Sequence, residues 1–162
     1  QRSFMERVAI FVDVQNVYYT SRQTYRKNFD YNAFWRTATA NRQVVKAYAY
    51  AVERGDTKQR EFQNILRAIG FEVKLKPFIQ RADGSAKGDW DVGITIDMMD
   101  AVSEADILIL VSGDGDFSIL CNRITEQGGK KVEVYGVPAL TAASLMQSAS
   151  EFIPIDQKLL LG

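Results

Sequence analysis

The segment of residues 106–112 restricts the fold more than any other part of the sequence. Between Asp106 and Ser112 it contains only isoleucine, leucine and valine. A run that is apolar at every position predicts a strand with both faces buried, which is typical of a parallel sheet covered by helices on each side. The remaining elements must therefore supply apolar helix faces for both sides of this strand.

Strand-like and helix-like segments alternate along the rest of the chain. Further strands are predicted at residues 8–13, 44–52, 71–78, 131–137 and 152–155, the last as a short edge strand. Helices are predicted at about residues 14–25, 30–41, 56–70, 91–103, 117–128 and 140–150. This order predicts an α/β fold, a three-layer αβα sandwich with a mainly parallel central sheet. We expect one domain over residues 1–162, with its core at about 7–155.

Some details of this prediction concern single segments. Residues 80–88 are small and polar and predict a loop. In the helix of residues 91–103, Val92, Ile96 and Met99 are expected to form one apolar side. In the helix of residues 14–25, Tyr18 and Tyr25 are expected to pack on the core.

Composition bounds the class of protein. Hydrophobic residues make up 46% and charged residues 25%, which is ordinary for a globular protein. No apolar run is long enough to span a bilayer, and the single Cys121 cannot form an internal disulfide, which fits the cytoplasm. The formal net charge is zero, which argues against a protein that coats nucleic acid unspecifically.

The chain has no histidine. This excludes Ser-His-Asp and Cys-His catalysis, a histidine general base and His-ligated zinc. With one cysteine, a cysteine-rich metal site is excluded as well. Any bound metal must be a hard cation held by oxygen atoms, which indicates Mg²⁺ or Mn²⁺.

Two predicted strands end in carboxylates. Asp13 ends the first strand, while Asp114 and Asp116 follow Ser112 at the end of the most apolar one. Ligands of open α/β sheets bind at the carboxyl ends of strands, where the strand order reverses. Each aspartate also suits helix capping, and Asp116 is the natural cap of the following helix. Capping does not explain three carboxylates at one crevice, because converging buried carboxylates repel unless a cation or a proton compensates them.

A third group of acids lies at the start of the helix of residues 91–103. Asp89 and Asp91 are near its N-terminus, where the helix dipole alone favours negative charge. Asp97 lies about a third of a turn from Asp91 around the helix. Asp91 is the preferred metal ligand of this group, with Asp89, Asp97 and Ser112 as secondary candidates.

Substrate contacts are expected outside the acidic centre. Basic residues alternate with tyrosines after Asp13, a pattern that can bind phosphates and stacked bases when exposed. The candidate substrate-binding residues are Asn16, Arg22, Arg26, Arg81, Lys87 and Trp90. Asn16 also suits a plain turn role, and Lys87 a solvated loop.

Three motifs, in this order, resemble the NYN-domain proteins, LabA-like members of the PIN-like nuclease superfamily. They are FVDVQN (residues 11–16), KGDWDVGITIDM (87–98) and VSGDGDF (111–117). The resemblance covers about residues 7–155. It implies a PIN-like, Rossmann-like sheet, Mg²⁺ or Mn²⁺ held by aspartates, and endonuclease action on RNA. By position, Asp13, Asp91, Asp114 and Asp116 match the acidic site, with Asn16 nearby.

The expected activity is therefore metal-dependent hydrolysis of RNA, with single-stranded RNA as the substrate. Such hydrolysis needs no histidine. The alternative is a regulatory or scaffold protein of the same fold that binds RNA or a protein without cutting. The presence of all four aspartates favours the active enzyme.

Overall fold

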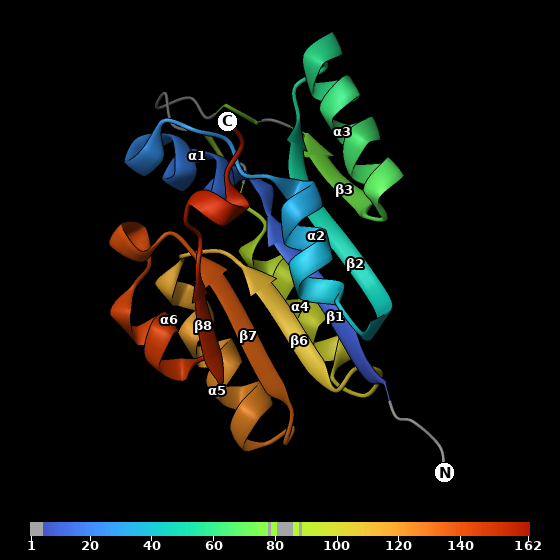
Figure 1. Cartoon of the computed structure of the whole chain (residues 1–162), viewed down its shortest axis with the longest axis vertical. Coiled ribbons are helices and arrows are strands. Elements are labelled where there is room, and N and C mark those ends of the chain that lie inside the picture. Colours follow the sequence, from blue (N-terminus) through green and yellow to red (C-terminus); the bar gives the residue numbers. More distant parts are fainter. Residues whose placement is uncertain (1–4, 78, 81–85, 88) are drawn as a thin grey trace.

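Six strands form the central sheet of the structure (Figure 1). The computed structural model describes residues 5–77, 79–80, 86–87 and 89–162. The strands are β1 (Glu6–Asp13), β2 (Arg42–Glu53), β3 (Glu72–Pro77), β6 (Ile107–Val111), β7 (Lys131–Gly136) and β8 (Glu151–Pro154). They are ordered β3-β2-β1-β6-β7-β8, and all neighbours are parallel. The predicted α/β fold with a parallel sheet is confirmed, and β8 is an edge strand.

Helices cover both faces of the sheet. Along β6, Ile107 and Ile109 face one hydrophobic core and Leu108 faces the other, because successive side chains of a strand point to opposite sides. The first core is closed by α1 (Val14–Tyr25), α2 (Tyr31–Thr39) and α3 (Thr57–Ile69). The second is closed by α4 (Asp91–Ala101), α5 (Ser118–Glu126) and α6 (Ala143–Ser148). This arrangement is the predicted three-layer sandwich. In the described ranges, no helix combines the length and the apolar character that a membrane span requires.

The predicted apolar side of α4 was wrong. Val92 is 72% exposed and Ile96 54% exposed, whereas Ile94 and Met98 are fully buried. The helix carries apolar residues on two sides at helical spacing, so periodicity alone does not select one of them. Packing against β1 and the neighbouring helices selects the side of Ile94 and Met98.

Three other local predictions need correction. Within the region expected to be a loop, β4 (Ile79–Gln80) and β5 (Ala86–Lys87) pair as antiparallel strands. The helix expected at 140–150 is shorter, because the 3-10 turn η2 (Pro138–Leu140) occupies its start. Tyr18 is half exposed, whereas the Tyr25 hydroxyl donates to the carbonyl of Ile155 at 2.8 Å.

One ion pair links strands that are not neighbours. Arg42 of β2 donates to both carboxylate oxygens of Glu133 of β7, at 3.0 and 2.8 Å. The guanidinium also donates to the carbonyl of Ala38 at 3.1 Å. Strands β1 and β6 lie between the two partners, and both side chains are largely buried. The pair therefore spans the middle of the sheet near the amino ends of its strands.

Candidate metal centre

The acidic residues meet where the strand order reverses. From β1 the chain passes to β2 and β3 on one side, and later to β6, β7 and β8 on the other. Val12 of β1 pairs with Val111 of β6, so the turns that follow these two strands are adjacent. Asp13 lies in one turn and Asp114 in the other. The prediction that they share the switch point of the sheet is confirmed.

Three carboxylates come close enough together to bind one cation. Oxygen atoms of Asp91, Asp114 and Asp116 all lie within 4.8 Å of one another. Asp91 is the first residue of α4, and Asp116 belongs to the 3-10 turn η1 (Gly115–Phe117). Asp114 and Asp91 are partly buried, and Asp116 is exposed. Residues about 25 positions apart in the sequence thus supply oxygen ligands to one small volume.

Asp13 lies beside this group and is buried, with 8% of its surface exposed. Burial, together with the charges of Asp114 and Asp89, raises its pKa from 3.8 to about 6, although hydrogen bonds from Asn16 and Ser112 oppose the rise. The pKa of Asp91 rises from 3.8 to about 7, first because of burial, then because of contact with Asp114 and the charges of Asp89 and Asp13. These pKa values indicate mutual repulsion, which a bound cation would relieve.

A short hydrogen-bond network holds the two turns together. The backbone N–H of Asn16 donates to Asp13 Oδ1 at 3.3 Å, and Ser112 Oγ donates to Asp13 Oδ2 at 3.4 Å. The amide of Gly113 donates to Asn16 Oδ1 at 2.9 Å, and the amide of Asp114 donates to Ser112 Oγ at 3.2 Å. Asn16 and Ser112 therefore position the acidic turns. Asn16 is predicted from the sequence as a substrate contact or a turn residue, and no local pattern signals its link to Gly113.

The turn after β6 also depends on its glycines. A Cβ on Gly113 would lie 2.8 Å from the backbone oxygen of Leu140, and one on Gly115 would lie 2.8 Å from Ala142 Cβ. The turn is packed tightly against the segment that leads into α6. In it Asp114 Oδ1 accepts the amide of Asp116 at 2.9 Å. Asp114 is thus the helix cap, and the prediction of Asp116 as the cap was wrong.

The structure separates the alternatives on α4. Asp89 is exposed and lies outside the group of three carboxylates, although its Oδ1 accepts the amide of Asp91 at 3.4 Å. Asp97 lies on another side of the helix, where it accepts from the hydroxyl of Tyr50 at 2.8 Å and from Lys74 Nζ at 2.7 Å. A secondary role for Asp97 as a metal ligand is not supported, because its charge is already paired with a lysine.

The predicted substrate contacts lie in different places. Arg22 and Arg26 are exposed at the end of α1, where the Arg22 guanidinium donates to the carbonyl of Arg26 at 3.3 Å. Trp90 precedes α4 and donates from Nε1 to the carbonyl of Ala51 at 2.9 Å, which anchors its ring to β2. Arg81 lies outside the described residues, and Lys87 is described only as a residue of β5.

Comparisons with known proteins identify the family. The NYN domain family matches residues 7–156. The Low amplitude and bright protein LabA of Synechococcus elongatus is 32% identical over 123 residues, which are 68% of this chain and 63% of that protein. A crystal structure of VPA0982, a protein of unknown function from Vibrio parahaemolyticus, matches with a TM-score of 0.94 and 58% identity over 99% of each chain.

The chain spans less than two thirds of the LabA protein, whereas the match to VPA0982 is nearly complete. The motifs that carry the acidic residues fall inside the matched range of the family. The resemblance found in the sequence is therefore confirmed, and the chain belongs to the NYN-domain family.

Proposed function

We propose that this protein is a metal-dependent endoribonuclease. The observation that carries the proposal is the convergence of Asp91, Asp114 and Asp116, with oxygen atoms within 4.8 Å of one another. In the described part of the chain, no lysine or arginine forms an ion pair with any of them or with Asp13. Among the described residues, no basic side chain compensates their charge, so a divalent cation suits the site.

The donor set fits Mg²⁺ or Mn²⁺, since it offers only oxygen atoms. We assign the cation to Asp91, Asp114 and Asp116, with Asp13 as the fourth carboxylate of the site. When bound, such a cation lowers the pKa of water and stabilises the negative charge that develops on a phosphoryl group. The buried Asp13 and the partly buried Asp114 are fixed by Ser112 and Asn16, so the carboxylates keep their places when substrate arrives.

RNA is the proposed substrate because the NYN domain belongs with the PIN-like nucleases, as the motifs imply. Exposed groups on α1 supply what an acidic centre lacks. Arg22 and Arg26 are positively charged and exposed, and the rings of Tyr18 and Tyr19 are half exposed on the same helix. Cations contact backbone phosphates and aromatic rings stack with bases, which are the usual contacts of single-stranded nucleic acid.

Cleavage of a labelled single-stranded RNA with increasing Mn²⁺ or Mg²⁺ tests the proposal. We expect cleavage that EDTA abolishes and that Asp91→Asn and Asp114→Asn reduce steeply. Asp100→Asn is the matched control, because Asp100 is an exposed aspartate at the other end of α4. Single-stranded DNA of the same sequence tests whether the sugar matters.

Undiminished cleavage by the Asp91→Asn and Asp114→Asn double variant would refute the assignment of the site. If the folded wild-type protein binds RNA but cuts none at any metal concentration, the protein is a binding member of the fold. Circular dichroism of each variant shows that lost cleavage is not lost folding.

A further inference from the structure

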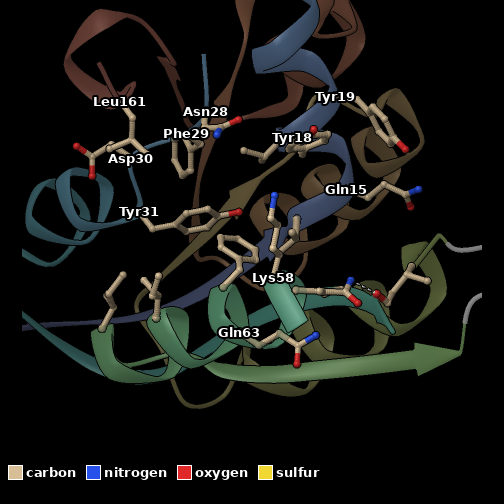
Figure 2. Close-up of a pocket in the computed structure, with 18 of the residues that line it drawn as sticks. Gln15, Tyr18, Tyr19, Asn28, Phe29, Asp30, Tyr31, Lys58, Gln63 and Leu161 are labelled. Atoms are coloured by element: carbon tan, nitrogen blue, oxygen red, sulfur yellow. Dashed lines mark hydrogen bonds between the residues drawn. The ribbon is translucent and has the colours of Figure 1, made fainter. Parts of the chain in front are cut away.

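A cavity lies beside the metal centre, and none of the four aspartates of that centre lines it. Its volume is about 840 Å³, within the usual range of about 300–1,000 Å³ for small-molecule sites. It is bounded by α1, the start of α2 and α3 along its length (Figure 2). Its aromatic lining comes from Tyr18, Tyr19, Phe29, Tyr31 and Phe62.

Several contacts join this cavity to the acidic centre. Val14 and Gln15 line it and directly follow Asp13 in the chain. Burial and the charge of Asp13 both raise the pKa of the Tyr31 hydroxyl, so Tyr31 is within electrostatic reach of that carboxylate. On the other side, Ala51 lines the cavity and accepts the hydrogen bond of Trp90, the residue before Asp91. The cavity therefore adjoins the segments that carry Asp13 and Asp91.

The lining offers flat rings together with the cationic residues Arg54 and Lys58. The rings of Tyr18 and Tyr19 meet edge to face, with centroids 5.5 Å apart, and each residue is 51% exposed. Figure 2 shows the Lys58 side chain and the Tyr31 ring both directed into the cavity. Lys58 forms no ion pair with another described residue, so its charge is available to an anion.

Some of the other polar groups of the lining already form hydrogen bonds within the protein, and one does not. The carboxylates of Asp30 and Asp56 accept the amides of Ala33 and Gln59 as helix caps. Gln63 is 2% exposed, and its Nε2 has no hydrogen-bond partner among the residues that the structure describes. Figure 2 shows this amide directed away from Lys58 and Tyr31, so Gln63 is not counted as a ligand contact.

We propose that this cavity holds one unstacked base of the RNA chain, next to the nucleotide whose phosphate lies at the metal centre. The base packs among Tyr18, Tyr19 and Tyr31, and Lys58 contacts the phosphate attached to it. A nucleotide combines a flat ring, hydrogen-bonding edges and a negative charge, which are the features that this lining recognises. The inference rests on the proposed function, because that function brings RNA to the neighbouring carboxylates.

Binding of abasic RNA tests the proposal independently of cleavage. Short single-stranded RNAs, each lacking one base at a different position, are titrated against the Asp114→Asn variant and against its Tyr18→Ala and Lys58→Gln derivatives. Loss of the pocketed base should weaken binding about 5- to 150-fold, since stacking on an aromatic side chain contributes about 1–3 kcal/mol per base. Only one position of the RNA should show this loss, and Tyr18→Ala should have no further effect on the RNA that lacks that base.

Two matched controls separate the pocket from the general surface. Lys131→Gln removes the same charge at the start of β7, in the other half of the sheet, and Ile119→Ala truncates an exposed apolar side chain on α5. Both should bind all the RNAs as the parent does. If Tyr18→Ala and Lys58→Gln also bind like the parent, with no position sensitive to base removal, the pocket is not an RNA site.

The two proposals fail in different ways. If the wild type cuts RNA, and Tyr18→Ala and Lys58→Gln bind and cut it equally well, the base pocket is refuted and the nuclease proposal stands. Protein that never cuts, yet shows the position-specific loss, would refute the nuclease and support the pocket. A third outcome is that Lys58→Gln weakens the binding of adenosine or uridine monophosphate but leaves RNA binding unchanged. That outcome would assign the cavity to a free nucleotide and overturn the RNA proposal.

Discussion

Asp13→Asn should stabilise the metal-free protein at neutral and alkaline pH. The asparagine side chain has the shape of the aspartate side chain. Its oxygen can still accept the hydrogen bond from the backbone N–H of Asn16. The pKa of Asp13 rises from 3.8 to about 6, chiefly because of burial and the charge of Asp114. At about 1.36 kcal/mol per pH unit, that rise corresponds to up to about 3 kcal/mol of unfavourable free energy in the charged folded state.

The sign of the pH dependence follows from the direction of the pKa rise. The folded protein holds its proton more tightly than the unfolded chain, so the free energy of unfolding falls as pH rises from about 4 through 6. Above about pH 6 the full penalty is present in the wild type and absent in Asp13→Asn. Below about pH 3 Asp13 is largely protonated in both states, so the two proteins should have nearly equal stability.

Thermal unfolding in EDTA at pH 3, 6 and 8 measures this difference, with Asp100→Asn as the control. At pH 8 the melting temperature of Asp13→Asn should exceed that of the wild type by up to about 6–12 °C, at about 2–4 °C per kcal/mol for a domain of this size. Adding Mn²⁺ should narrow the difference, because the wild type gains about 2.7 kcal/mol at a hundredfold excess over the dissociation constant. A variant that is less stable than the wild type at pH 8 in EDTA would refute the reasoning.

Three further outcomes are expected. Gly113→Ala should lower the free energy of unfolding by about 1–3 kcal/mol, because its Cβ would lie 2.8 Å from the Leu140 carbonyl oxygen; an unchanged urea midpoint would contradict this packing. Arg22→Gln and Arg26→Gln should each lower the salt dependence of RNA binding by about 0.7 in log–log slope if they contact phosphate, and equal slopes would place the RNA elsewhere. Cleaved RNA should carry a 5′-phosphate and a 3′-hydroxyl, because a chain without histidine favours attack by water; cyclic phosphate ends, detected by ligation and phosphatase treatment, would contradict hydrolysis.

The fold was predictable because its strands are unambiguous. The run at residues 107–111 is apolar at every position, and Asp13 and Asp114 follow the strands that the topology places side by side. The position of an acid at the carboxyl end of a parallel strand is a local property of the sequence, and parallel packing brings such ends together. The meeting of Asp13 and Asp114 was therefore predictable as well.

Features that depend on tertiary packing were not predictable from the sequence. Which side of α4 is buried depends on the surface that the helix meets, since Val92 and Ile94 both fit an apolar periodicity. The pairing of Asp97 with Lys74 joins residues 23 positions apart, and no local pattern signals it. The cavity beside the metal centre is formed by three helices that the sequence predicts one at a time, so its lining could not be derived from their spacing.

The ion pair between Arg42 and Glu133 has a consequence for cooperative unfolding. The sheet consists of two halves, β3-β2-β1 and β6-β7-β8, and the pair connects one half to the other across the seam. Separating the halves would break both charge-assisted hydrogen bonds of the pair, which are stronger than hydrogen bonds between neutral groups. Partial opening at the seam is thus suppressed, so the amides of β2 and β7 should exchange with solvent only when the whole sheet unfolds.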